Sequence, residues 1–301
     1  AQDCGEVSIT EMDWGSAVIV TQVAKFLLEQ GYGCSITVVP SASTPALASV
    51  SETGEPDIIT EVWTNGAPAY IPLLEAGKIN ELTHVLSDGG VEGLWIPVYL
   101  AEAHPELLTI EGVLANPDLV GNRMHNCPVG WTCQVIATNV AKAGGFEASG
   151  VEDFVHGSGE TLTASIASAY SSKEPWFGYY WSPSLVLGKY PMVQVALGSH
   201  DPAQQACNSD VNCATPMVQN WPSSVVTTVV TDTFEASHPA EADVMRNLSF
   251  TNAMMNGLLA WQDENKATGD EAAVYFLSTQ QDIWKSWIND SARGKLAALL
   301  Q

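Results

Sequence analysis

Apolar positions in the first third of the chain switch between a period of two and a period close to four. Residues 7–12 alternate apolar and polar side chains, as a half-buried strand does. From Ile19 to Leu28 the apolar residues recur at a spacing of four, as on one face of a helix, and glycines end the run. By the same criteria we expect strands at residues 7–12, 35–39 and 56–62, and helices around 19–28, 45–50 and 67–76.

Repeated strand–helix units of this kind predict an α/β fold with a parallel, doubly wound sheet. Ligands of such open sheets bind at the carboxyl ends of the strands. Trp14 lies two residues beyond the first strand and Trp63 directly follows the third. We therefore expect both tryptophans on the ligand side of one sheet.

The middle of the chain has a different character. We expect a strand at residues 134–138, a helix at 159–170 and an aromatic loop at 175–183. A strand-like run at 225–230 precedes a helical C-terminus from about residue 240 to 300. The chain lacks a repeat and a low-complexity linker, which favours two lobes with a chain crossing between them: residues 1–97 plus 216–301, and residues 98–215.

The charge balance excludes one class of partner. The chain has 34 Asp and Glu against 11 Lys and Arg, a formal net charge of −23. A nucleic-acid-binding protein needs clustered basic residues, so we expect no nucleic acid. An uninterrupted apolar run of about 20 residues, as a membrane span requires, is absent from the sequence. The start at Ala1 suits a chain whose signal peptide has been removed, although an engineered start would look the same, so we expect an extracytoplasmic protein. We also expect a monomer.

Six cysteines fall into pairs. Cys127 and Cys133 are six apart, as are Cys207 and Cys213, while Cys4 and Cys34 each precede a strand. If those two strands are parallel neighbours, Cys4 and Cys34 meet at one sheet edge. Three disulfides in an oxidising compartment account for the even count. The alternative is zinc held by His125, Cys127 and Cys133, but that set lacks the usual short knuckle and a fourth ligand.

Ten tryptophans need sorting between core and site. Most large aromatic side chains are core residues, and five tryptophans have surroundings that fit this role: Trp95, Trp221, Trp261, Trp284 and Trp287. The other five follow strands or lie in Gly- and Pro-containing loops, where their rings would be rigid. Several rings facing one another form a cage for a cation, each desolvated contact contributing about 2 kcal/mol. The candidate cage residues are Trp14, Trp63, Trp131, Trp176 and Trp181.

These motifs resemble the substrate-binding proteins of ABC importers for glycine betaine, choline and trimethylamine N-oxide. The similarity rests on residues 11–16, 57–63, 130–133 and 174–183, in the family's order. It implies a two-lobed periplasmic-binding-protein clamp of type II, each lobe a mainly parallel sheet flanked by helices, which closes on its ligand and docks on a membrane permease. It also implies cage roles for Trp63, Trp131 and Trp181, with Trp14 and Trp176 as further walls.

Acidic residues beside the expected cage guide the choice of ligand. Glu11, Asp13 and Glu61 flank Trp14 and Trp63, and a carboxylate there would repel the carboxylate of betaine. We expect trimethylamine N-oxide first, with Glu11 as its polar partner, and then betaine, choline or dimethylsulfoniopropionate. The alternative for Glu11 is a solvated or helix-capping acid near a helix N-terminus.

A second candidate site lies between Cys207 and Cys213. Oxygen-bearing side chains alternate there, as in loops that gather Ca²⁺, although the glycine turn and terminal Glu of an EF-hand are missing. A polar, disulfide-closed loop without metal is the alternative. The candidate ligands of a structural calcium ion are Asp201, Asn208, Asp210 and Asn212.

Enzymatic motifs are weak, so we expect no enzyme. A secreted hydrolase could use Ser158 beside His156, but the Gly-x-Ser-x-Gly spacing is absent and residues 151–154 resemble a helix cap more than a strand. An inert adhesion domain would leave the loop tryptophans unexplained. We expect all six histidines at the surface: His84, His104, His125, His156, His200 and His238.

Overall fold

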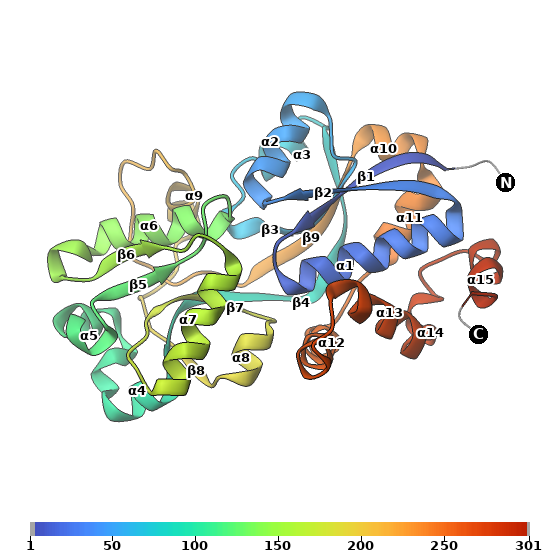
Figure 1. Cartoon of the computed structure of the whole chain (residues 1–301). Coiled ribbons are helices and arrows are strands. Elements are labelled where there is room, and N and C mark those ends of the chain that lie inside the picture. The colour runs from blue at the N-terminus through green and yellow to red at the C-terminus, as the bar shows by residue number, and fades with distance from the viewer. Residues whose placement is uncertain (1–3, 300–301) are drawn as a thin grey trace. The chain divides into compact units, whose positions relative to one another are not determined.

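The computed structural model describes residues 4–299 (Figure 1). The chain divides into two compact units. Unit 1 contains the chain up to Thr64, Ala69–Gly89, and the chain from Val225 onward. Unit 2 contains Asn65–Pro68 and Gly90–Ser224. Each unit combines strands with helices, as the α/β pattern of the sequence predicts. The expectations for residues 1–3 fall outside the described part of the chain.

Unit 1 is built on parallel strands. Strand β1 (Gly5–Met12) lies between β2 (Cys34–Ser41) and β3 (Ile58–Trp63), parallel to both. Strand β9 (Ser224–Thr231) pairs with β3 in the antiparallel direction. In the β1–β2 register Gly5 lies opposite Cys34, which brings Cys4 beside Cys34, and the two form a disulfide. The parallel pairing and this disulfide are confirmed.

The helices of unit 1 also follow the predicted pattern. Helix α1 (Gly15–Phe26) packs against β1 and β3, continues as a π-helical turn (Leu27–Tyr32) and ends at Gly33 with φ of 78° (Figure 1). Its buried face contains the residues whose spacing predicted it. The remaining helices are α2 (Ser43–Thr53), α3 (Tyr70–Glu75), α10 (Asp232–Ser237), α11 (Pro239–Asn247), α12 (Asn252–Asn265), α13 (Gly269–Thr279), α14 (Gln281–Trp284) and α15 (Asp290–Ala297).

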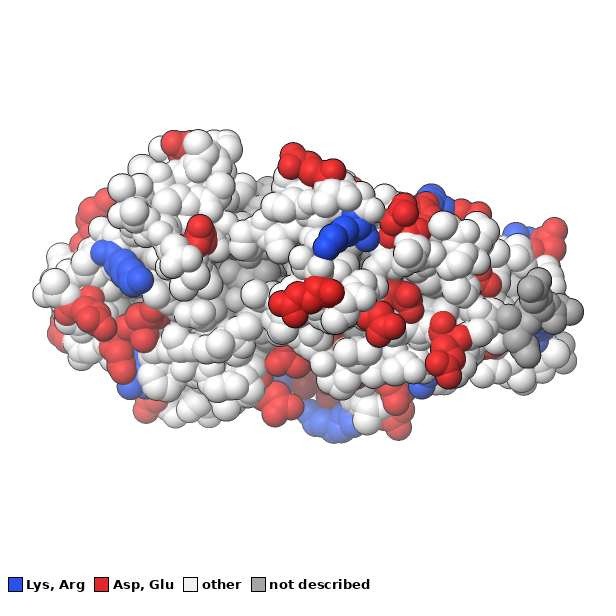
Figure 2. Space-filling model, turned by 90° about the horizontal axis from the view of Figure 1, so that it is seen from above, with Lys and Arg blue, Asp and Glu red and all other residues white. Residues whose placement is uncertain are grey.

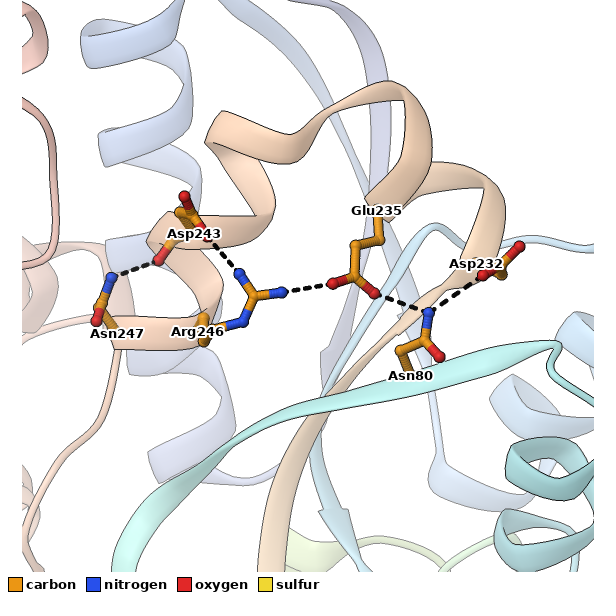
Figure 3. A network of polar contacts seen from close by, with 6 residues as sticks. All are labelled: Asn80, Asp232, Glu235, Asp243, Arg246 and Asn247. Atoms are coloured by element: carbon orange, nitrogen blue, oxygen red, sulfur yellow. Dashed lines mark hydrogen bonds and ion pairs between the residues drawn. The ribbon is translucent and has the colours of Figure 1, made fainter.

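A polar network on the surface of unit 1 joins α10 and α11 to β4 (Ile79–Pro97) (Figure 3). The Arg246 guanidinium contacts Asp243 on its own helix and Glu235 on α10. Glu235 also accepts a 2.7 Å hydrogen bond from the Asn80 amide on β4. Because these groups are solvent-accessible, such pairs contribute little free energy each. The network links two short helices to β4.

Unit 2 also contains parallel and antiparallel strand pairs. Strand β5 (Arg123–Asn126) lies parallel to β6 (Glu152–Val155) and β7 (Gly178–Ser182). The later part of β4 pairs antiparallel with β7 and with β8 (Met192–Gln194). The helices are α4 (Val98–Ala103), α5 (Ile110–Ala115), α6 (Thr132–Gly144), α7 (Gly159–Ser172), α8 (Leu185–Lys189) and α9 (Pro202–Asn208).

Three sequence predictions for unit 2 are wrong. Residues 134–138 lie within helix α6 and not in a strand; Ile136 and Val140 are buried at helical spacing. Residues 151–154, interpreted as a helix cap, lie mostly within strand β6 (Glu152–Val155). Trp181, expected in a loop, lies within β7, whose first four residues are all buried. A strand buried on both faces shows no alternation, so its aromatic run resembles a loop.

The surface carries the predicted acidity. On the face shown in Figure 2, acidic side chains are scattered widely and basic ones occur at few places. Among the described residues, none of the helices has the length and apolarity needed to cross a membrane.

Candidate ligand-binding site

A buried carboxyl group organises the tryptophans of unit 1. Glu61, near the end of β3, is fully buried. Its Oε2 atom accepts hydrogen bonds from the Trp14 indole N–H at 2.5 Å, the Ser16 hydroxyl at 3.0 Å and the Trp63 indole N–H at 3.4 Å. Trp14 lies between β1 and α1, and Trp63 is the last residue of β3. The Glu61 side chain therefore connects residues at the carboxyl ends of β1 and β3. The expectation that both tryptophans lie at this edge is confirmed.

The backbone at Glu61 is unusual. Its φ is +53°, a left-handed conformation that side chains other than glycine rarely adopt. The register between β3 and β9 shifts between Ile59 and Val62, which marks a bulge. Bulges redirect a side chain, and backbone strain is concentrated at functional sites. The bulge therefore explains how Glu61 and Trp63 direct polar groups to one place.

Burial controls the charge on Glu61. Desolvation raises its pKa to about 7, and the hydrogen bonds from Trp14, Ser16 and Trp63 offset this only in part. Its other oxygen, Oε1, is buried and lacks a hydrogen-bond partner among the described residues. A buried polar atom without a partner destabilises the fold by about 1–3 kcal/mol. An orphaned oxygen beside two indole rings is the feature expected where a ligand completes the hydrogen bonding.

Unit 2 contains a second aromatic cluster. The rings of Trp131 and Trp181 meet edge to face, with centroids 5.3 Å apart and planes at 79°. Tyr180 stacks on Trp181 at 4.4 Å, and Tyr179 lies 6.3 Å from it. Trp131 immediately precedes α6, within the loop that the Cys127–Cys133 disulfide closes. The structure therefore groups the four tryptophans as two pairs, Trp14 with Trp63 and Trp131 with Trp181.

Trp176 has the contacts of a core residue. It is 1% exposed, its ring stacks on His125 at 5.2 Å, and its indole N–H donates to Ser165 at 2.9 Å. His125 Nδ1 lies 2.9 Å from Nε2 of His156. Burial first, and then the neighbouring His156 and Arg123, lower the pKa of His125 to about 3. The prediction of surface positions for these two histidines is wrong, because His125 packs against Trp176 and His156 packs against His125.

Glu92 is the buried acid of unit 2, and both its oxygens have partners. Oε1 accepts from the Tyr179 hydroxyl at 2.7 Å, while Oε2 accepts from the Asn65 amide at 3.1 Å and from the Ser224 hydroxyl. Burial raises the pKa of Glu92 as well. Because both oxygens accept hydrogen bonds within the protein, this carboxyl group has a structural role.

Sequence reasoning selected Glu11 as the polar partner. In the structure Glu11 is half-buried and accepts a hydrogen bond from the Gln22 amide on α1. Its role in ligand binding stays a prediction. Glu61, named only as a flanking acid, is the one that contacts both indoles. Its spacing of two from Trp63 within a strand was the available signal, because such residues share a face.

The loop expected to bind calcium has local hydrogen bonds. Asp201 caps α9 through the Ala203 N–H, and the Asn208 amide pairs with the backbone of Met217 in both directions. Asp210 accepts from the Asn212 N–H at 2.8 Å. The Cys207–Cys213 and Cys127–Cys133 disulfides are both present, which excludes the zinc alternative. Calcium at Asp201, Asn208, Asp210 and Asn212 stays a prediction.

Ser158, the nucleophile of the hydrolase alternative, has a structural role. Its hydroxyl accepts from the Thr161 N–H at 3.2 Å and forms a capping box at the start of α7. His156 contacts the Thr161 hydroxyl, 3.2 Å away. These side chains stabilise a helix terminus and do not form a nucleophile–base pair.

The chain has relatives among proteins that bind small methylated solutes. A family model described as the substrate binding domain of ABC-type glycine betaine transport systems (OpuAC) matches residues 5–279. A trimethylamine N-oxide-binding protein of Pelagibacter ubique is 20% identical, over 92% of this chain and 89% of that protein.

Solved structures share the fold. A glycine betaine, L-proline-binding protein (ProX) of Borrelia burgdorferi superposes with a TM-score of 0.79 at 18% identity, covering 96% of this chain and 99% of ProX. An ABC-transporter choline-binding protein in complex with choline gives a TM-score of 0.77 at 18% identity, with 98% of each chain covered. At these identities the likeness establishes the fold.

Proposed function

Because the chain belongs to the family of substrate-binding domains of ABC-type glycine betaine transport systems, we propose that it delivers trimethylamine N-oxide to a membrane permease. The family consists of binding proteins and not of enzymes. At the family level, the protein is an extracytoplasmic substrate-binding protein for small quaternary ammonium solutes. The choice of trimethylamine N-oxide is the new element of the proposal.

Paired tryptophans in both units support an aromatic cage. A methylated nitrogen offers no N–H, so it gains most from the negative faces of aromatic rings, about 2 kcal/mol for each desolvated contact. Trp14 and Trp63 are held through their N–H groups, and Trp131 and Trp181 through ring packing. We propose that one ligand uses rings of both pairs, with Trp176 as a support and not a wall.

The orphaned oxygen of Glu61 is the single observation that carries the choice of ligand. When Glu61 is protonated, Oε1 can donate a hydrogen bond to the oxygen of an amine oxide. A pKa of about 7 makes that form abundant near neutral pH. The relative in Pelagibacter ubique, named for the same solute, supports the choice only weakly at 20% identity. Betaine and dimethylsulfoniopropionate carry carboxylates, which an ionised Glu61 repels.

Choline is the second candidate. Its hydroxyl could donate to Oε1 of ionised Glu61, and the choline-binding neighbour shares this fold.

Delivery from a periplasmic location agrees with three disulfides, which persist in oxidising compartments. Docking on a permease and action as a monomer are parts of the same proposal.

Isothermal titration calorimetry with four solutes tests the choice of ligand. We expect trimethylamine N-oxide to bind most tightly at neutral pH, choline next, and betaine and dimethylsulfoniopropionate more weakly. Tighter binding of betaine would overturn the choice of ligand. No measurable binding of any of the four would overturn the proposed function as a whole.

A further inference from the structure

Glu61 is completely buried. Its Oε2 atom accepts hydrogen bonds, whereas its Oε1 atom has no hydrogen-bond partner among the described residues. We propose that the protonation state of this carboxyl selects between two ligand classes: the neutral form takes amine oxides, and the ionised form takes permanent onium cations. The inference rests on the proposed function, because it assumes that methylated ligands bind beside Trp14 and Trp63.

The hydrogen bonds of Glu61 fix where a proton resides. Oε2 faces only donors: two indole N–H groups and the hydroxyl of Ser16, whose oxygen lies 3.0 Å away. A proton on Oε2 would compete with the indole hydrogens, so a protonated Glu61 carries its proton on Oε1. That atom has no partner within the described chain. The neutral side chain therefore presents a hydrogen-bond donor, and an amine-oxide oxygen is a strong acceptor for it.

The ionised side chain presents the opposite chemistry. Its charge is buried and needs compensation, which a tetramethylammonium ion beside the indole faces supplies by charge and by cation–π contact. An amine oxide is neutral overall and directs a negative oxygen toward Oε1, where two acceptors would face each other. Each ligand class therefore fits one protonation state and is rejected by the other.

Among the described residues, the elements packed against β3 do not supply a competing charge to Glu61. Strand β3 is packed against β1, β9, α1 and α2. None of the charged side chains on these elements is among the influences on the pKa of Glu61, which are burial and the bonds from Trp14, Ser16 and Trp63. The pKa of about 7 places the change of state within the neutral range. The charged residues on those elements are Glu6 and Glu11 on β1, Lys25 on α1 and Glu52 on α2, with none on β9.

Linkage gives the two ligand classes opposite pH dependences. An amine oxide raises the pKa of Glu61, so its binding takes up protons and its affinity falls by up to about tenfold per unit as pH rises above the pKa of the free protein. An onium cation lowers the pKa, so its binding releases protons and its affinity falls by up to about tenfold per unit as pH drops below that value.

Calorimetry of the wild-type chain tests this directly. Trimethylamine N-oxide and tetramethylammonium chloride would be titrated at about pH 6 and about pH 8, in buffers that differ in ionisation enthalpy, to count protons exchanged. We expect uptake of about 0.9 proton with the amine oxide at the higher pH and release of about 0.9 with the cation at the lower pH.

A matched pair of variants identifies the residue that takes up or releases the protons on ligand binding. In Glu61→Gln the amide oxygen must face the three donors, so the amide N–H points where Oε1 was and imitates the protonated acid. We expect pH-independent binding of the amine oxide and cation binding about tenfold weaker than wild type at the higher pH. Glu92→Gln, equally buried but in unit 2, should retain the proton exchange of the wild type.

The outcomes separate the two proposals. Binding of both ligands with the same pH trend and no proton exchange would overturn the selection by Glu61 and leave the proposed function standing. Binding of neither ligand at either pH would overturn both. Proton exchange that persists in Glu61→Gln would also contradict the inference, because another group would then be titrating.

Discussion

Each unit buries one glutamate among aromatic side chains, and the two carboxyl groups differ in their hydrogen bonding. Glu92 in unit 2 has hydrogen-bond donors on both oxygens. Glu61 in unit 1 has three donors on one oxygen and none on the other. Burial raises the pKa of both, so burial alone does not distinguish a structural acid from a ligand-binding one. What distinguishes Glu61 is its Oε1 atom, which lacks a hydrogen-bond donor among the described residues.

The two aromatic pairs differ in a related way. Trp14 and Trp63 are held at their edges by one carboxyl oxygen, whereas Trp131 and Trp181 are held by ring packing and by a nearby disulfide. Changes at Glu61 should therefore affect the first pair only. Changes at the Cys127–Cys133 loop should affect the second pair only.

The largest effect is expected from removing one ring of either pair. Trp63→Leu and Trp181→Leu keep apolar volume but lose the aromatic face. Each should weaken trimethylamine N-oxide binding by about 30-fold, corresponding to about 2 kcal/mol of cation–π contact. Trp261→Leu is the control, because its ring stacks on Tyr275 among the C-terminal helices and should leave affinity unchanged. A loss at only one pair would mean that a single unit holds the ligand.

Removing a disulfide tests the anchoring of the second pair. The double variant Cys127→Ala, Cys133→Ala should lose about 2 kcal/mol of unfolding free energy, as expected for a short closed loop. It should also bind about fivefold more weakly, because the Trp131 side chain must then be ordered on binding. The matched variant Cys207→Ala, Cys213→Ala should lose similar stability without loss of affinity. The folded state of both double variants would be checked by denaturation. Equal losses of affinity in the two would contradict the role of the Cys127–Cys133 disulfide in anchoring Trp131.

The two buried acids should respond differently to the same substitution. Glu92→Gln turns an amide N–H toward one of its three donors and should lower the unfolding free energy by about 1 kcal/mol. Glu61→Gln can keep all three donors on its amide oxygen and cannot ionise, so it should be as stable as wild type below about pH 4.5, where Glu61 is protonated in the folded and the unfolded chain. It should become more stable than wild type as pH rises from 4.5 to about 7. Urea unfolding measures both, and a larger loss at Glu61 would show that its second oxygen has a partner in the folded chain.

The last effect concerns acid conditions and unit 2. His125 has a pKa lowered from 6.5 to about 3, so the unfolded chain binds its proton first. Stability from this group is present above pH 6.5 and is lost as pH falls toward 3, by about 1 kcal/mol per pH unit. Hydrogen exchange should report faster opening of β5 and β6 on acidification. His125→Phe should reduce that dependence, and an unchanged slope would contradict it.

Local patterns predicted much of the fold. The alternation at residues 7–12 and the spacing from Ile19 onward correspond to β1 and α1, and the cysteine pairs correspond to the disulfides. Strand β4 was missed because Gly89 and Gly90 interrupt its pattern, as at a turn. Its pairing is set by partners distant in the sequence, so tertiary contacts override the local signal.

The candidate site was predictable in its residue types but not in its geometry. Loop and strand-end positions selected four tryptophans that the structure groups into two pairs. They also selected Trp176, which stacks on His125, and its role in the cage stays a prediction. Glu11 and Glu61 each lie near the end of a strand and close to a tryptophan, and the sequence distinguishes them only by the spacing of two between Glu61 and Trp63. Only the bulge at Glu61, which local propensity does not show, directs that side chain onto both indoles.

Indole N–H resonances of the ¹⁵N-labelled protein, titrated with trimethylamine N-oxide, test the central claim most directly. Each of the ten tryptophans contributes one signal. The account predicts large shifts for Trp14, Trp63, Trp131 and Trp181, with Trp261 and Trp284 unmoved. Saturable shifts confined to other tryptophans, or no shifts at millimolar ligand, would contradict the claim that both pairs hold one methylated ligand.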